Sequence, residues 1–173
     1  MKNALIALAL FALPLSAATL PDYSGEWVYD ASSSTDMPRM FEKVTHWTLN
    51  VKQNAKQLTT SVRIENSEMP TYEQSFTYAL DGSETKTETS IMTPDGPRPV
   101  PTTLQAKVGE AGVLQLTITR ELPMNGEPVR GIIHEDWTLS KDGHTLTIHR
   151  RDDGPRKADM TIVFQRGGIV PVH

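Results

Sequence analysis

Apolar and polar residues alternate with a period of two along most of this chain, in segments rich in β-branched and aromatic side chains. Successive side chains of a strand point to opposite faces of a sheet, so this alternation is typical of strands with one buried face. Turn-forming residues interrupt the pattern at short intervals, as in a series of hairpins. The strands predicted in this way span 25–31, 43–52, 57–65, 72–80, 84–91, 102–108, 113–120, 132–140, 144–151 and 158–166.

The register of four hairpins follows from the same pattern, because paired strands must place their apolar residues on one face. A two-residue turn at Asp142-Gly143, suited to type I′, is predicted to pair Trp137 with Ile148 and Leu139 with Leu146. The other predicted pairs are Val51 with Leu58 and Trp47 with Val62, Tyr78 with Thr85 and Phe76 with Thr87, and Val108 with Leu114 and Ala106 with Leu116. One shared inward face favours closure, so we predict an all-β fold, a single antiparallel up-and-down meander closed into a barrel of about 8–10 strands.

The connections of such a meander alternate between its two ends. One end receives the tight turns at 53–56, 81–82, 109–112 and 141–143, which predict a closed floor. The other end receives the long segments 31–42, 65–71, 92–101, 121–131 and 152–157, with one short helix predicted over 36–42. Functional residues concentrate on loops held by a rigid scaffold, so this end is the predicted mouth.

The first residues are typical of an export signal. Lys2 precedes an apolar run over 4–13, and small residues follow at 16–18, where a signal peptidase would cleave after Ala18. The run is shorter than the roughly 20 residues of a membrane-spanning helix. We therefore expect a signal peptide over 1–18, a single β-barrel domain over 19–173 that does not span a membrane, and a periplasmic or secreted location. No cysteine follows the run, so we expect no lipid anchor.

Composition excludes several classes of function. The chain has no cysteine, so thiol catalysis and cysteine metal sites are excluded. Its formal net charge is -4, and it has no stripe of basic residues interleaved with aromatic ones, so we expect no nucleic-acid partner. We expect no cofactor.

The residues Ser24-Gly25-Glu26-Trp27 resemble the Gly-x-Trp opening of lipocalins and related calycin barrels. The segment 137–147 is similar to the closing hairpin of small exported bacterial lipocalin-like domains. The resemblance implies a barrel whose floor is closed by Trp27. It also implies that an arginine near the last strand packs over this tryptophan, and Arg166 is the matching residue.

Methionines gather at the predicted mouth. The six that follow the signal segment are Met37, Met40, Met69, Met92, Met124 and Met160. Methionine is flexible and polarisable, so one interpretation is a mouth that accepts varied lipid-like or aromatic ligands. The other interpretation is that these side chains fill gaps under long loops. Soft thioethers also bind Cu(I), which makes Met37, Met40 and His46 an alternative metal site.

Polar residues on the predicted inward face form a second group of candidates. Arg120 and Arg150 lie near the mouth, and Glu135 is predicted to stand opposite Arg150, with Tyr72 and Tyr78 on the same face. A buried charge needs a partner, so Glu135 and Arg150 are expected to pair. If Arg120 has no carboxylate partner, it is available to the anionic head of a fatty acid or a similar ligand.

These features predict an exported lipocalin-like protein that binds a small, largely apolar or amphipathic ligand in its barrel mouth. One alternative is an envelope-associated interaction module with a solidly packed barrel, which would present 92–101 and 121–131 to a protein partner. Another is an enzyme with Glu135 as its base, which would require Glu135 without its arginine partner. We identify no catalytic residue, since His134 and His149 are predicted to face outward opposite Arg151 and Asp136. An interior volume separates the binding protein from the packed module.

Overall fold

The computed structural model describes residues 20–93, 96–124, 127–155 and 157–168, with side chains for all of them except 92, 93, 96, 97 and 111. The predicted signal segment 1–18 lies outside these residues. Among the described residues, no helix combines the length and the apolar character needed to cross a membrane.

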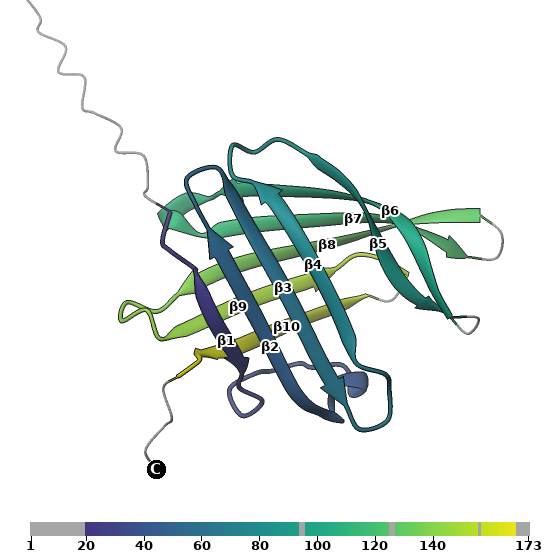
Figure 1. Ribbon diagram of the computed structural model, residues 1–173, viewed down its shortest axis with the longest axis horizontal. Coiled ribbons are helices and arrows are strands. Elements are labelled where there is room, and N and C mark those ends of the chain that lie inside the picture. Colours follow the sequence, from purple (N-terminus) through teal and green to yellow (C-terminus); the bar gives the residue numbers. More distant parts are fainter. Residues whose placement is uncertain (1–19, 94–95, 125–126, 156, 169–173) are drawn as a thin grey trace, which may run out of the picture.

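Ten strands form one antiparallel meander, which confirms the predicted fold class (Figure 1). Their order in the sheet is β4-β3-β2-β1-β10-β9-β8-β7-β6-β5. The strands are β1 (Gly25–Tyr29), β2 (Val44–Gln53), β3 (Gln57–Asn66), β4 (Tyr72–Ala79), β5 (Thr85–Thr93), β6 (Gly96–Val108), β7 (Leu114–Met124), β8 (Glu127–Leu139), β9 (Thr145–Asp152) and β10 (Ala158–Arg166). Two short 3-10 helices, η1 (Arg39–Phe41) and η2 (Glu110–Gly112), complete the described elements.

Two of the four predicted registers are confirmed without change. Trp137 pairs with Ile148 across β8 and β9, and Ala106 pairs with Leu116 across β6 and β7. The predicted type I′ turn is wrong, because Gly143 has a positive φ and Asp142 does not. The residue pairs across β8 and β9 are nevertheless the predicted ones, because the alternating apolar residues of both strands must lie on the same face of the sheet.

The register of β2 with β3 differs from the prediction by two residues. Trp47 pairs with Ile64 rather than Val62, and Val51 pairs with Thr60 rather than Leu58. The cause is Asn54, whose side chain accepts hydrogen bonds from the backbone N–H groups of the two residues that precede Leu58. This places the turn one residue later than predicted. A shift of two preserves the inward face, so the apolar residues still point into the barrel.

The predicted pairing of β4 with β5 is wrong. The two strands lie at opposite ends of the strand order, and the described residues contain no ladder between them, although they run beside each other (Figure 1). Phe76 and Tyr78 pair with β3 alone. Asp81 accepts hydrogen bonds from Ser83, and the carbonyl of Gly82 accepts one from Gln105 of β6. The turn is thereby held against β6 and does not close a tight hairpin, so the barrel is nearly closed, with a seam between β4 and β5.

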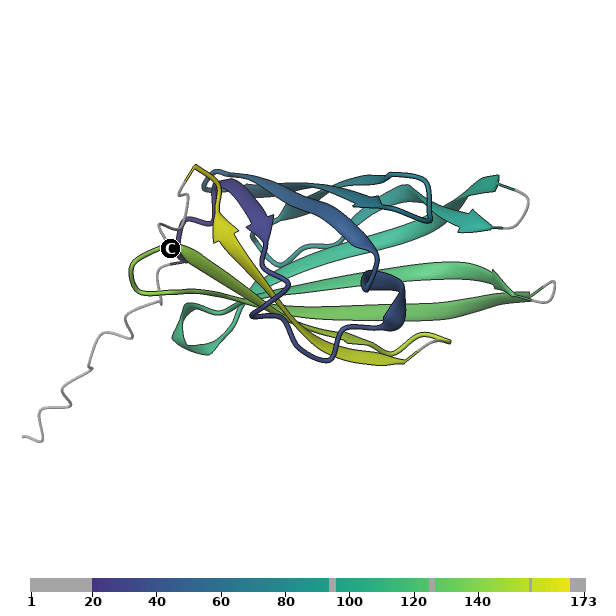
Figure 2. The same ribbon diagram turned by 90° about the horizontal axis from the view of Figure 1, so that it is seen from below.

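The predicted long loops at 92–101 and 121–131 are also wrong. Strands β5 and β6 stay paired from Thr93 and Gly96, and β7 and β8 from Met124 and Glu127, so two hairpin arms project beyond the barrel (Figure 2). Prolines at 97, 99 and 101 alternate along β6, so their missing N–H groups share one edge. That edge faces away from β5, and β6 pairs with β7 only from Thr102 onward. The prolines therefore separate the two arms.

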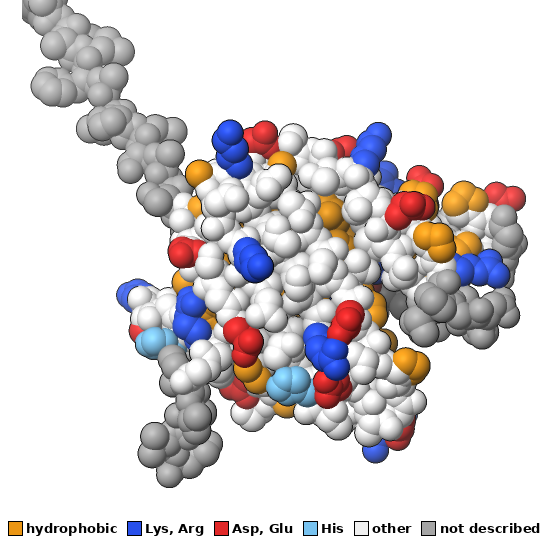
Figure 3. Space-filling model, in the orientation of Figure 1, with side chains coloured by type: hydrophobic (Ala, Val, Ile, Leu, Met, Phe, Trp, Pro, Cys, Tyr) orange, Lys and Arg blue, Asp and Glu red, His pale blue; other side chains and the backbone are white. Residues whose placement is uncertain are grey.

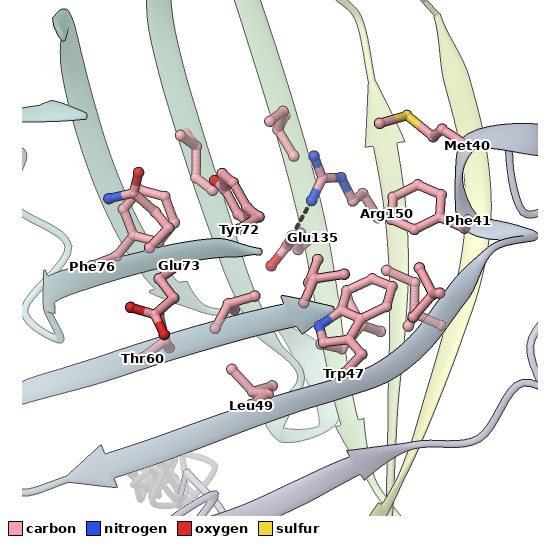
Figure 4. Close-up of a pocket in the computed structure, with 18 of the residues that line it drawn as sticks. Met40, Phe41, Trp47, Leu49, Thr60, Tyr72, Glu73, Phe76, Glu135 and Arg150 are labelled. Carbon is pink, nitrogen blue, oxygen red and sulfur yellow. Dashed lines mark hydrogen bonds and ion pairs between the residues drawn. The ribbon is translucent and has the colours of Figure 1, made fainter. Parts of the chain in front are cut away.

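The predicted helix over 36–42 is reduced to the single turn of η1, whose N-cap is Pro38. Asp36 does not cap it, because its φ of 58° places it in the left-handed region before the turn. The segment still crosses the mouth end of the barrel and brings Met40 and Phe41 over the interior (Figure 4).

The floor of the barrel is closed as the Gly-x-Trp resemblance implies. Trp27 is fully buried, and its indole N–H donates to the Tyr23 carbonyl at 2.9 Å. The Arg166 guanidinium lies 4.3 Å from the centroid of the Trp27 ring. It also donates to the carbonyl oxygens of Ser24 and Gly143, each at 2.8 Å. This contact joins the first strand, the last strand and the β8–β9 turn at the closed end.

Candidate functional site

A cavity of about 630 Å³ occupies the barrel above this floor. Met40 and Phe41 line it at the mouth (Figure 4). Met69 also lines the cavity at this end, and Trp137 and Tyr78 line it toward the floor. Most of the remaining wall is apolar, because the inward positions of the alternating strands carry leucine, isoleucine, valine and phenylalanine. Ligand sites have this character, with a largely apolar lining and a few polar groups that fix orientation.

The structure brings together seven of the ten predicted ligand-binding residues. The cavity lining includes Met40, Met69, Tyr72, Tyr78, Arg120, Glu135 and Arg150. Met37 packs against the core beside the cavity, and the side chain of Met92 lies outside the described part of the chain. Met124 is 39% exposed on the β7–β8 arm, near the 37% exposed Val129, and Figure 3 shows hydrophobic side chains on this arm. Met160 is buried in the core.

Glu135 and Arg150 form the predicted pair across β8 and β9. An Arg150 Nη1 atom lies 3.4 Å from Glu135 Oε1, and the Glu135 side chain is 11% exposed (Figure 4). The second carboxylate oxygen of Glu135 accepts a hydrogen bond of 2.9 Å from the indole N–H of Trp137. Both oxygens of this carboxylate are therefore engaged. The unpaired Glu135 that an enzymatic base requires is not present.

Arg120 is the cation of the cavity that has no carboxylate partner among the described residues. Its guanidinium lies 5.7 Å from the centroid of the Phe76 ring, a cation–π contact that reaches from β7 across the seam to β4. Glu73 also borders the cavity, but its carboxylate pairs with Arg63 on the outer face. Among the residues that the structure describes, the inner face of the cavity therefore carries two arginines and one glutamate, a net positive charge.

Three buried side-chain atoms in the described part of the chain have no hydrogen-bond partner. They are Trp47 Nε1, Arg120 Nε and Arg150 Nε. All three belong to residues that line the cavity, and all three are donors. Buried polar groups are nearly always hydrogen-bonded, so three orphan donors around one cavity call for acceptor atoms inside it. The sequence pattern predicted Trp47 as an inward apolar residue and did not identify it as a polar contact.

Tyr78 adds a neutral hydroxyl group near the floor. Burial raises the pKa of Tyr78 well above its usual value, and the nearby Glu135 charge raises it further, while Arg120 and Arg150 oppose the shift. The phenol therefore stays protonated at physiological pH. It adds polarity to the cavity without adding charge.

The histidines and the alternative copper residues do not form a centre at the cavity. His149 stands opposite Asp136 as predicted, but its side chain bonds Asp159 at 2.8 Å on the outer surface. His46 is exposed on β2, one residue before the inward-facing Trp47, whereas Met40 lines the cavity. No group of three histidine, aspartate or glutamate side chains suited to a metal ion exists in the part of the chain that the structure describes.

Comparison with models of known protein families finds none that matches this chain, and no curated protein is significantly similar to it. The nearly closed antiparallel barrel agrees with a lipocalin-like architecture. The cavity and its three donors without partners are therefore the features from which a function is inferred.

Proposed function

We propose that this protein binds one small amphipathic molecule, with its apolar body in the barrel and its anionic head at Arg120. One observation carries the proposal. Among the described residues, three buried side-chain atoms have no hydrogen-bond partner, and all three are donors on residues that line the same cavity. An acid head offers only acceptors when ionised, so it complements such a lining.

The apolar part of the ligand is supported by the size and lining of the cavity. About 630 Å³ lies within the roughly 300–1,000 Å³ typical of small-molecule pockets. Ile118, Ile133 and Ile148 project from three neighbouring strands to one wall, and Leu49 and Val62 face them. Burial of apolar surface is worth roughly 25 cal/mol per Å², so an alkyl or aromatic body supplies most of the affinity.

The two arginines of the cavity wall have different partners, and this difference supports an anionic head on the ligand. Arg150 shares its charge with Glu135, whereas Arg120 lies against the face of Phe76 and has no carboxylate partner in the part of the chain that the structure describes. A carboxylate at Arg120 would accept from its planar fork in a bidentate geometry. The cation–π contact holds the guanidinium in place beforehand, which reduces the ordering cost of binding.

We propose further that the barrel is lipocalin-like and acts outside the cytoplasm. The support is the Gly-x-Trp opening with its Arg166 contact, together with the signal-like residues 1–18. The apolar body of an amphipathic ligand is poorly soluble in water, so a barrel that surrounds this body suits a carrier in the periplasm or the extracellular medium.

The two alternative functions have less support. A packed interaction module needs a filled interior, which the cavity opposes. An enzyme with Glu135 as its base needs a free carboxylate, whereas both oxygens of Glu135 are engaged.

The proposal is tested with the mature protein and a fluorescent long-chain fatty acid, displaced by the unlabelled acid and by its methyl ester. We expect Arg120→Met to weaken binding of the acid by roughly 10- to 100-fold, as expected for loss of a charge-assisted hydrogen bond. Binding of the ester should change little. Arg151→Met is the matched control, because Arg151 adjoins Arg150 and is half-exposed on the outer face. Failure of any apolar probe to bind, or equal affinities for the acid in Arg120→Met and wild type, would overturn the proposal.

A further inference from the structure

We infer that the indole N–H of Trp47 binds the ligand, and that the ligand carries a second acceptor oxygen apart from its anionic head. This inference rests on the proposed function and specifies the class of ligand, an acid with a hydroxyl, keto or ether oxygen on its apolar body.

The three tryptophans of the chain provide an internal comparison. Trp27 donates to the Tyr23 carbonyl, and Trp137 donates to Glu135, each at 2.9 Å. Trp47 is 5% exposed, and its Nε1 has no partner among the described residues. A buried tryptophan usually finds an acceptor for its N–H group, because a missing hydrogen bond is costly away from water. Trp47 is the exception, and it lines the cavity.

The ring of Trp47 is held by aromatic contacts on several sides. Phe41 stacks on it with centroids 5.3 Å apart and an interplanar angle of 14°. Tyr29 lies at 5.0 Å, and Phe164 meets the ring edge-on at 5.5 Å. Figure 4 shows the indole nitrogen on the side of the ring away from Phe41. The aromatic cluster therefore fixes the direction of the N–H group, and an acceptor must come to it.

A single head group does not serve both Trp47 and Arg120. Trp47 is on β2 and Arg120 on β7, the third and eighth strands in the order of ten, so they belong to opposite walls of the barrel. A carboxylate bound at Arg120 leaves the Trp47 N–H to a different oxygen. This oxygen is neutral, because the other arginine of the cavity wall, Arg150, is already paired with Glu135.

The test compares a long-chain fatty acid with a series of its hydroxy and keto derivatives that carry the oxygen at successive positions. We expect wild-type protein to prefer one position by roughly five-fold over the parent acid, the size of one neutral hydrogen bond. Trp47→Phe keeps an aromatic ring beside Phe41 but removes the donor, so in this variant the preferred derivative should bind no more tightly than the parent acid. A preference that persists in Trp47→Phe, or no preference in wild type, would overturn the inference.

A second measurement does not depend on the variant being stable. In ¹⁵N-labelled wild-type protein the three indole N–H groups give separate NMR cross-peaks, and that of Trp47 is assigned through its contacts with Phe41. The preferred derivative should shift this peak further downfield than the parent acid does. Equal shifts with both ligands would contradict the inference.

The outcomes separate the two proposals. If no fatty acid of either kind binds, the proposed function fails and the inference fails with it. If the parent acid binds in an Arg120-dependent manner but no derivative is preferred, only the role of Trp47 is refuted.

Discussion

Substitution of Gly25 by alanine should destabilise this barrel more than the same substitution at a turn glycine that has a positive φ and open space around it. Gly25 has a φ of +138°, and a Cβ atom built on it would lie 2.6 Å from the Arg166 Nη1 atom. That guanidinium is not free to retreat. It donates to Ser24 and Gly143, and it covers the ring of Trp27.

The expected loss has two parts. An alanine at this φ costs about 1–3 kcal/mol of backbone strain. Displacement of Arg166 breaks at least one charge-assisted hydrogen bond, worth about 1.5–3 kcal/mol. The sum is about 2.5–6 kcal/mol, a large share of the roughly 5–15 kcal/mol by which a typical domain is stable.

Gly143→Ala is the matched control. Gly143 also has a positive φ, of +73°, but a Cβ atom there would meet nothing within 4 Å. Only the left-handed backbone is penalised, so the expected loss is about 1–2 kcal/mol. The free energy of unfolding of both variants is measured by urea denaturation, followed by tryptophan fluorescence and circular dichroism. Equal losses in the two variants would refute the steric argument.

A double-mutant cycle makes the test sharper. In an Arg166→Ala background the clash is already removed, so Gly25→Ala should then cost only its backbone strain. Additive effects of the two substitutions would show that the Arg166 contact does not explain the sensitivity of Gly25.

Two further predictions concern charged groups. Arg150→Met leaves the carboxylate of Glu135 without its cation, and because Arg150 is 28% exposed we expect a loss of about 1–3 kcal/mol in urea denaturation, less than for a fully buried pair. The outward-facing Arg151→Met should change stability by no more than about 0.5 kcal/mol, and an equal effect of both would contradict a structural ion pair. Hydrogen bonds, led by the one from the Ser32 hydroxyl, lower the pKa of Asp30 from 3.8 to about 2. A lowered carboxyl pKa stabilises the protein above pH 3.8, and this effect is lost as the pH falls through about 2. Because solvent screens this partly exposed carboxylate, wild type should be more stable than Asp30→Asn by only about 1–2 kcal/mol at neutral pH. The difference should shrink as the pH falls from 3.8 and disappear below about 2. A constant difference over this pH range would exclude Asp30 as the cause.

Much of the site was predictable because strand alternation reports directly which side chains share a face. Glu135 opposite Arg150 follows from the apolar pairs around the β8–β9 turn, and the structure confirms this register. The Trp27–Arg166 contact was implied by the Gly-x-Trp resemblance and is present. Both predictions needed only local pattern or a short motif.

Other features escaped prediction because side chains in the turns compete with the alternation signal. Asn54 moved one turn by a residue, and the contact of Gly82 with Gln105 prevented the β4–β5 hairpin. The prolines of β6 suggested a loop, yet their spacing by two allowed strand pairing on one edge. A pattern of single residues does not show which edge of a strand is used.

The period of two and the positions of the turns were sufficient to predict the class of fold and the inward face of the strands. The three-dimensional structure was needed to show that the barrel is hollow, that its seam lies between β4 and β5, and that Arg120 reaches across it to Phe76. It alone also distinguished Trp47, whose N–H lacks a partner, from the two satisfied tryptophans. Cavity volume and hydrogen-bond satisfaction depend on side chains from strands far apart in the chain, and the distances between these side chains are set only when the sheet curves and closes.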